Sequence, residues 1–327
     1  MPANINSIAY ANEVPWHGMG TRMKDRFTSE EALKQGGLDW EVEKLEIKTT
    51  SSIEIPSHRA VIRKDTKEVL GVVGKGYQIL QNRDAFSFFD EAIKDRSAIF
   101  ETVGALGKGE KVWMLAKVEG SDFSVLGEDQ VQPHLLLYHG HDGFTSVTGM
   151  FTPIRVVCQN TLKVALASNT DKIRVKHTGN VQEKLKLAGA MLRMTGAMID
   201  ETKPIFKALA NRSLSASESS QYIMKSLSNR SVIKTLEDES EQLKASVEKV
   251  EELVETGLGS DIRGVRGTAW GTYNAITEYI DHHRNPRGGQ ENRLGSIWFG
   301  QGSQVKQRAF VLGAKLSGVK MEDMLIS

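Results

Sequence analysis

The pattern of apolar residues changes near residue 179, and this change constrains the fold more than any other feature. Before it, short stretches alternate apolar and polar residues, as half-buried strands do. After it, apolar residues step by three and four, which indicates helices with a heptad-like stripe over 181–199 and 236–254. We therefore expect an α+β protein with a β-rich α+β domain over residues 1–178 and a helical domain over residues 179–327.

Local signals predict the elements of both domains. Thr28 or Ser29 as the N-cap, followed by acidic residues and then Gly36 as the stop, indicates a short helix. Glycines at 107–110 predict the turn of a hairpin. Asn160 is a favoured N-cap residue, so a helix is expected to follow it. The remaining predicted strands lie over 40–50, 129–158 and 171–179, with two strands around the turn at 64–68 and a third before residue 80. Further helices are expected over 81–95, 213–227, 267–283 and 303–318.

The composition narrows the classes of protein. The chain has 327 residues, a formal net charge of +1 and one cysteine, so we expect no disulfide framework and no cysteine-cluster metal site. A single cysteine fits a reducing, cytoplasmic setting. There is no long apolar run, and the start lacks the basic and apolar regions of a signal peptide. We expect no membrane partner and no cofactor.

The stretch "TPIRVVCQNTLKVAL", residues 152–166, contains that cysteine, Cys158. A cysteine nucleophile needs a base within hydrogen-bond reach. The turn "YHGHDG", one strand upstream, supplies His139, His141 and Asp142. The same side chains, joined by His177, are candidate metal ligands. Against both interpretations, Cys158 ends an apolar run, which indicates core, and Asp and Gly are common in turns. An enzyme is therefore an alternative, and we favour a protein without catalytic activity.

Basic residues of the β-rich domain suggest a surface that binds nucleic acid. Arg59 and Arg63 are four apart in one predicted strand, so they share a face. A basic sheet face can follow the phosphates of a nucleic acid, although the same spacing fits a solvated outer face. The glycines around Lys75 do not have P-loop spacing. The candidate contacts in this domain are Arg59, Arg63, Lys75, Tyr77, Arg155, Lys163, Arg174 and Lys176.

The sharpest local excess of positive charge lies at 282–308, where five cations face one acid, Glu291. A basic loop with exposed aromatic rings suits single-stranded nucleic acid, because rings stack on bases. The candidates here are Arg284, Arg287, Arg293, Trp298, Lys306 and Arg308. Alternatively, Trp298 and Phe299 anchor the loop onto the helical domain, since such side chains usually bury.

The heptad-like helices of 181–206 and 236–254 also have two interpretations. They pack inside one chain, or they form the interface of a homo-oligomer or of a complex with a host protein. Stripes this short favour packing within the chain, and a homo-oligomer remains the alternative.

Four motifs resemble a protein family of phages and plasmids, the phage/plasmid-like proteins, also known as domain of unknown function 932. They are "PWHGMG" at 15–20, "GVVGKGYQILQN" at 71–82, "RVVCQNTL" at 155–162 and "SIWFGQGSQVKQRAF" at 296–310. The resemblance spans most of the chain. It implies a mobile-element origin and a cytoplasmic protein, and it supplies no catalytic residues for this sequence.

The order of predicted strands and helix over residues 40–95 is also similar to the core of single-strand annealing proteins of the Rad-fifty-two type. Those proteins bind DNA along a basic groove, whereas this chain is nearly neutral and has a long helical second half. We therefore expect a phage or plasmid accessory protein that binds nucleic acid, with single-stranded DNA in recombination or replication as the leading partner. The alternatives are a Cys/His or metal-dependent enzyme and a protein of assembly or host interaction.

Overall fold

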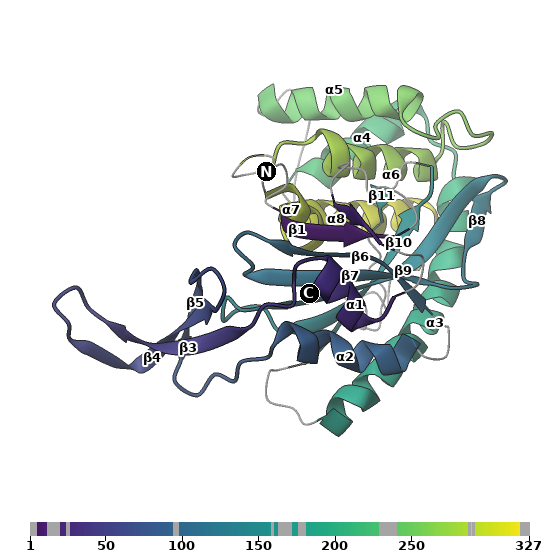
Figure 1. The fold of residues 1–327 in the computed structure, drawn as a ribbon. Coiled ribbons are helices and arrows are strands. Elements are labelled where there is room, and N and C mark those ends of the chain that lie inside the picture. Colours follow the sequence, from purple (N-terminus) through teal and green to yellow (C-terminus); the bar gives the residue numbers. More distant parts are fainter. Residues whose placement is uncertain are drawn as a thin grey trace. The chain divides into compact units, whose positions relative to one another are not determined.

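Figure 1 shows the computed structural model of the chain. The structure describes residues 5–11, 20–23, 27–93, 98–157, 160–162, 172–175, 181–228, 241–286, 289 and 292–320. Unit 1 comprises Met1–Gly120, His134–Phe151 and Lys172–Thr195; unit 2 comprises Ser121–Pro133, Thr152–Asp171 and Gly196–Ser327. The units interleave because strands β9 (Asp129–Gly140) and β10 (Val147–Arg155) each contribute residues to both. The single domain boundary after residue 178 stays a prediction.

A large, mainly antiparallel sheet is the centre of unit 1. Its strands include β1 (Ile5–Tyr10), β2 (Thr21–Arg22), β6 (Ala98–Leu106), β7 (Lys111–Val118) and β12 (Lys172–Val175). They pair in the order β10–β9–β7–β6–β1–β2, and β12 pairs with β10. The hairpin β6–β7 has the predicted turn, in which Gly107 and Gly109 have φ angles of 67° and 115°. Glycine adopts such angles without steric cost, so the glycine signal was sufficient here.

Two helices pack against β6 in this unit, α1 (Ser29–Gln35) and α2 (Asn82–Ile93). The predicted cap of α1 is confirmed. Thr28 Oγ1 accepts a bond from the Glu31 N–H, and the Glu31 carboxylate accepts one from the Thr28 N–H, which is a capping box. The hydroxyl of Ser29 donates to Asp90 on α2 at 2.6 Å and ties the helices together. Buried apolar side chains of both helices complete the core, Leu33 and Phe86 among them.

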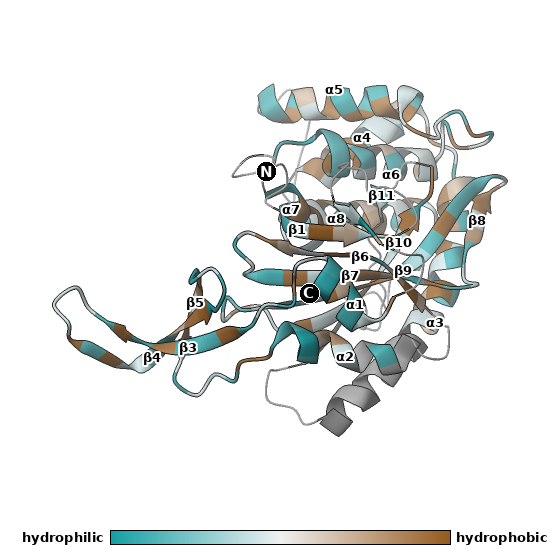
Figure 2. Cartoon of the chain, in the orientation of Figure 1, coloured by the Kyte–Doolittle hydropathy of each residue, from teal (hydrophilic) through white to brown (hydrophobic). Residues whose placement is uncertain are grey.

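A second, three-stranded sheet extends away from the large sheet of unit 1 (Figure 1). It consists of β3 (Val42–Lys48), β4 (Glu54–Arg63) and β5 (Val69–Gly74), antiparallel and in the order β3–β4–β5. Its inner face buries Val42, Val61 and Val73. Its outer face leaves Leu45 and Val72 exposed, and Figure 2 shows apolar residues along these strands. This sheet therefore has one face that enters the core at these valines and also carries Lys44 and Arg59, and one apolar face that is open.

The third strand predicted before residue 80 is wrong, since residues 75–81 contain no strand. After β5 the backbone turns instead. The Tyr77 N–H donates to Gly74 O and the Lys75 N–H donates to Ser57 O, both at 3.0 Å. The chain then passes directly into α2.

Unit 2 contains the helical part of the protein and several strand ends. Its elements are the second half of α3 (Val181–Asn211), α4 (Ala216–Leu227), α5 (Glu241–Thr256), α6 (Ala269–Glu278), a π-helix η3 (Tyr279–His283), α7 (Arg293–Phe299), α8 (Gln301–Leu316), β8 (Phe123–Leu126) and β11 (Asn160–Thr161). Aromatic rings from different elements form its core. Phe206 lies 4.7 Å from Trp270 and 6.1 Å from Phe310, centroid to centroid. The helix predicted over 213–227 is α4, and it begins with a second capping box, at Ser215.

The heptad-like stripe of α5 is buried within unit 2. Of its described members, Val247 and Val250 are buried and Leu243 and Val254 are half-buried, and α5 packs against α4, α6 and η3. Residues 236–240 lie outside the described residues. The described part of this stripe thus has the intrachain packing that the short heptads favour, and a role in assembly stays a prediction.

The α+β fold class is confirmed: β-sheets come first in the chain, and several helices follow. Across the parts that the structure describes, every helix is too short or too polar to cross a lipid bilayer.

Candidate functional site

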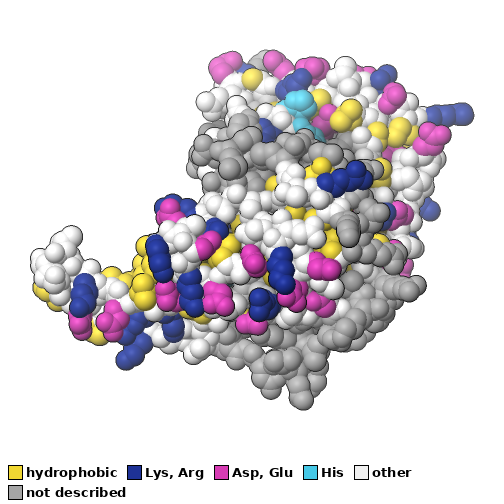
Figure 3. Space-filling view, viewed as in Figure 1, with side chains coloured by type: hydrophobic (Ala, Val, Ile, Leu, Met, Phe, Trp, Pro, Cys, Tyr) yellow, Lys and Arg dark blue, Asp and Glu magenta, His cyan; other side chains and the backbone are white. Residues whose placement is uncertain are grey.

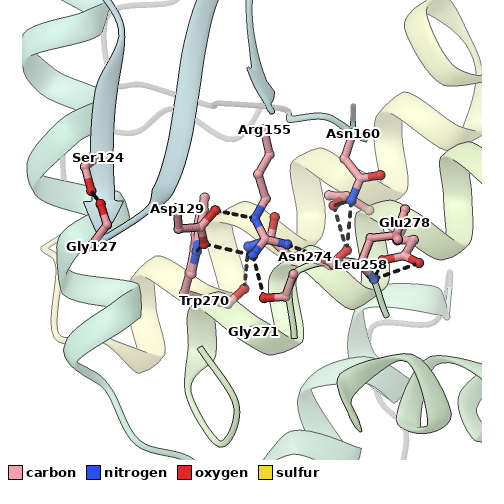
Figure 4. Close-up of polar contacts among 12 residues, drawn as sticks. Ser124, Gly127, Asp129, Arg155, Asn160, Leu258, Trp270, Gly271, Asn274 and Glu278 are labelled. Carbon is pink, nitrogen blue, oxygen red and sulfur yellow. Dashed lines mark hydrogen bonds and ion pairs between the residues drawn. The ribbon is translucent and has the colours of Figure 1, made fainter. Parts of the chain in front are cut away.

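Arg155, predicted to contact phosphate, lies at the centre of a buried polar cluster in unit 2 (Figure 4). Its side chain is 1% exposed. Nε and Nη2 donate to the two oxygens of Asp129 at 2.7 and 2.8 Å, and Nη1 and Nη2 donate to the carbonyls of Leu258 and Gly259. Trp270 Nε1 also donates to Asp129 Oδ2 at 2.7 Å. The guanidinium is enclosed by protein acceptors, so Arg155 holds unit 2 together and has no surface open to a phosphate.

Asn160, the next candidate in this motif, does not cap a helix. It lies in β11, pairs in register with Arg155, and is fully buried. Its Nδ2 donates to the Asn274 carbonyl and to Thr277 Oγ1, and its Oδ1 lies 2.9 Å from His282 Nε2. The prediction of an N-cap is wrong because the carboxamide is used to bind α6 and η3.

Lys306 belongs to the same cluster. Its Nζ donates to Asp281 Oδ1 at 2.7 Å and to Thr161 Oγ1 at 2.6 Å. Asp281 Oδ2 accepts bonds from the N–H and hydroxyl of Thr161, and the Asp281 carbonyl accepts a bond from Arg293 Nη1. Burial lowers the pKa of Lys306, while the Asp281 carboxylate acts in the opposite direction. Lys306 and Arg293 are both buried, so neither side chain forms part of a loop that is open to nucleic acid.

Asp281 and Thr161 were not singled out from the sequence. The signal for Thr161 was its place in "RVVCQNTL"; Asp281 lies in "YIDHH", which forms the π-helix η3. π-Helical turns are rare and occur often at functional sites. Here the turn presents a carboxylate to a lysine 25 residues away and to a threonine 120 residues away. The Thr161 hydroxyl lies between Lys306 and Asp281, as an activated nucleophile would. However, it already accepts a hydrogen bond from Lys306 and donates one to Asp281, so both interactions are made within the protein.

Arg63, in unit 1, is also enclosed. Nε and Nη2 bind the carboxylate of Asp65 at 2.8 and 2.9 Å, and Nη1 donates to Asn6 and to the Lys108 carbonyl. Its guanidinium lies 4.4 Å from the ring centroid of Trp40. The side chain is 7% exposed. Arg63 therefore fastens the β4–β5 turn to the β6–β7 turn and is not placed to bind phosphate.

The two histidines proposed as a base or as metal ligands occupy the core of unit 1. His139 and His141 are 0% and 1% exposed, and their Nε2 atoms lie 3.0 and 2.9 Å from Asn82 Oδ1. Asn82 Nδ2 donates to the Leu38 carbonyl, which orients the carboxamide. An amide oxygen only accepts, so both rings carry a proton on Nε2.

Asp142, the third member, stabilises its own turn. Its carboxylate accepts bonds from the N–H groups of Phe144 and Thr145 and from the Thr145 hydroxyl. Among the residues that the structure describes, no group of three or more His, Cys, Asp or Glu is arranged to hold a metal. Cys158 and His177 lie outside the described residues, so the thiol hypothesis stays a prediction.

Three predicted residues come together at one end of the three-stranded sheet: Arg59, Lys75 and Tyr77. The Lys75 N–H donates to Ser57 O, two residues from Arg59. Lys44, which was not among the predicted contacts, joins them because its Nζ donates to the Tyr77 carbonyl at 2.6 Å. Burial raises the pKa of Tyr77 to about 12. We call Lys44, Arg59 and Lys75 the basic end of the sheet.

The other candidates have separate positions. Trp298 is buried in α7, as the anchoring alternative predicted. Arg308 Nε donates to the Ser226 carbonyl at 2.9 Å, and Arg284 Nη2 lies 3.5 Å from Gln301 Oε1. Burial lowers the pKa of Arg308, and the charge of Arg284 acts in the same direction. Lys163, Lys176 and Arg287 lie outside the described residues, and Arg174 is placed only as part of β12.

The fold and these sites define a class: a mixed α+β protein whose sheets precede a helical region, with a buried arginine bound by a carboxylate in each unit. A family model, Domain of unknown function (DUF932), matches residues 69–298, well over half of the chain. The chain therefore belongs to the DUF932 family. Neither a curated protein nor a solved structure matches it.

Proposed function

We propose that this protein is a phage or plasmid accessory protein that binds single-stranded nucleic acid through the basic end of the three-stranded sheet. The proposal rests on Lys44, Arg59 and Lys75. None of the three has an ion-pair partner within the described part of the chain. Lys75 is exposed, while Lys44 and Arg59 are partly buried and donate to backbone carbonyls. Cations without a carboxylate partner contribute to nucleic-acid binding because they release counterions from the phosphates.

The other cations of the same sheet differ. Lys48 pairs with Glu54, Lys64 with Glu41, Lys67 with Glu43 and Arg63 with Asp65. Figure 3 accordingly shows Lys and Arg interspersed with Asp and Glu over the sheet. One carboxylate, Glu46, faces Arg59 in the β3–β4 register. The basic end therefore has three cations and one facing acid. Tyr77 lies beside it, half-buried against the core of unit 1 and influenced by the charge of Asp142, and it is the ring that we propose for stacking on a base.

Two further considerations support single-stranded DNA as the partner. The order β3–β4–β5–α2 is the strand and helix order that resembles the single-strand annealing proteins. The phage and plasmid origin that the family resemblance implies fits a role in recombination or replication. No catalytic role is assigned in this proposal.

The test is binding of a fluorescent single-stranded oligonucleotide, measured by anisotropy over a series of salt concentrations. Replacing Arg59 and Lys75 together by Gln is expected to weaken binding. It should also lower the slope of log K against log salt by about 1.4, that is about 0.7 for each lost phosphate contact.

The matched control replaces Lys64 and Lys67 by Gln, which removes the same charge from paired cations of the same sheet. This variant should retain the wild-type slope. If the wild-type protein does not bind the oligonucleotide at low salt, or if both double variants lose affinity equally, the proposed surface is wrong.

A further inference from the structure

The edge of β3 that faces away from β4 has no partner strand within the described residues, and a side chain occupies part of it. The Val42 N–H donates to Gln81 Oε1 and the Val42 carbonyl accepts from Gln81 Nε2, both at 2.9 Å. A side-chain carboxamide thus makes the pair of bonds that a neighbouring strand would make. Val42 therefore directs its backbone groups away from β4. This agrees with Glu41, whose carbonyl accepts from the Lys64 N–H on the β4 side.

The same edge continues beyond Gln81. Backbone groups of alternate residues in a strand point the same way. Lys44 and Glu46 therefore direct their N–H and C=O groups to the edge, as Val42 does. In the described part of the chain no backbone group bonds to them there. Edges of this kind pair readily with another strand.

We infer that the occupant is β3 of a second copy of this chain, paired antiparallel about a two-fold axis at Leu45. In this register Lys44 lies opposite Glu46 of the partner subunit, and Glu46 lies opposite Lys44 of the partner subunit. Both pairs are hydrogen-bonded pairs of the ladder, and both unite opposite charges. An isologous contact requires such self-complementarity, and the sequence "KLE" at 44–46 supplies it.

The outer face of the sheet gives independent support. Leu45, Ala60 and Val72 form one row across the three strands. Leu45 is 45% exposed and Val72 is 54% exposed. Pairing about Leu45 brings the two leucines side by side, so the two rows join into one apolar strip across six strands. Contiguous exposed apolar surface is characteristic of interaction sites.

Gln81 sets the extent of the added strand. Its carboxamide occupies the position at Val42, so a partner strand fits against residues 43–47 and meets Gln81 at the end. The side chains of Lys44 and Arg59 point to the same face of the sheet. In the dimer, Lys44 pairs with Glu46 of the partner subunit, so Arg59 and Lys75 of each copy are the cations left for the proposed function. The pairing itself does not depend on the proposed function, because it is measured without nucleic acid.

Sedimentation equilibrium of the full chain over a range of concentrations tests the pairing. We expect a monomer–dimer equilibrium for the wild type. Lys44→Glu and Glu46→Lys each place like charges opposite each other in both pairs, so each should weaken dimerisation by about tenfold. The double exchange Lys44→Glu/Glu46→Lys restores opposite charges and should restore the wild-type dissociation constant.

Lys64→Glu is the control, because Lys64 is exposed and pairs with Glu41 away from this register. It should leave dimerisation unchanged, and circular dichroism should show folded protein for all variants. A monomeric wild type, or a double exchange as weak as the single reversals, would overturn the inference. Loss of nucleic-acid binding with dimerisation intact would instead count only against the proposed function.

Discussion

The three-stranded sheet of unit 1 and the buried polar cluster of unit 2 use the same residue types in opposite ways. At the basic end of the sheet, Lys75 is exposed and makes no ion pair within the described residues. In the cluster, Arg155 and Lys306 are 1% exposed and each binds a carboxylate. The difference shows that a cation is enclosed where a buried carboxylate from another element binds it, as Asp129 binds Arg155, whereas Lys64 stays exposed although it pairs with Glu41. Spacing along a strand does not reveal this.

The largest expected loss of stability comes from a substitution that breaks a buried ion pair of the cluster. Asp129→Asn removes the charge that Arg155 and Trp270 contact while it preserves the shape of the side chain. Because a buried guanidinium is then left uncompensated, the free energy of unfolding should fall by about 3–5 kcal/mol. Urea denaturation measures this.

The matched control is Glu54→Gln, which removes the partner of Lys48 in an exposed pair of the sheet. Its expected cost is below about 1 kcal/mol. Equal costs for the two variants would contradict the distinction between the two regions.

The sequence predicted the elements well where their signals are local. Thr28 and Gly36 delimit α1, and the glycines of 107–110 gave the β6–β7 turn. The ion pair of Arg63 could also have been predicted from the sequence, because Asp65 follows it by two residues. Arg155 and Lys306 were different: their partners lie 26 and 25 residues away, on other elements. Only the tertiary fold brings these carboxylates to the cations. The sequence therefore could not predict which cations are buried and which are exposed.

The next smaller loss of stability is expected from removing a helix cap in each unit. Thr28 in unit 1 and Ser215 in unit 2 each complete a capping box. Thr28→Ala and Ser215→Ala should each lower the free energy of unfolding by about 1 kcal/mol, since each leaves a helix N–H without its acceptor.

Hydrogen exchange shows where each cap acts. If the units unfold independently, Thr28→Ala should speed exchange only in unit 1 and Ser215→Ala only in unit 2. Faster exchange throughout the chain in both variants would show that the units unfold together.

A pH-dependent effect is expected at Glu278, which contacts the Leu258 N–H in unit 2. Burial raises the pKa of Glu278 above its usual value of 4.5. The folded state then holds the proton more tightly than the unfolded chain. The stability from this group is present below pH 4.5 and is lost as pH rises through the raised pKa.

Glu278→Gln keeps an acceptor for Leu258 and removes the titration. Wild-type protein should therefore lose stability relative to Glu278→Gln as pH rises from 4 to about 7, measured by urea denaturation at each pH. A difference between the two proteins that stays constant with pH would show that the Glu278 carboxyl group titrates normally in the fold.

The smallest expected change in stability is that of Lys75, the exposed cation at the basic end. It provides a direct contrast with the buried cation Lys306. Lys75→Gln should change the free energy of unfolding by less than about 0.5 kcal/mol, because the residue is exposed and pairs with no carboxylate in the described structure. Lys306→Met leaves Asp281 buried without its counter-charge and should cost about 3 kcal/mol or more. The order reverses for oligonucleotide binding, measured where both variants are folded: Lys75→Gln should weaken it and Lys306→Met should not. A cation that contributes nothing to folding, yet is needed for binding, is then identified as part of the binding surface.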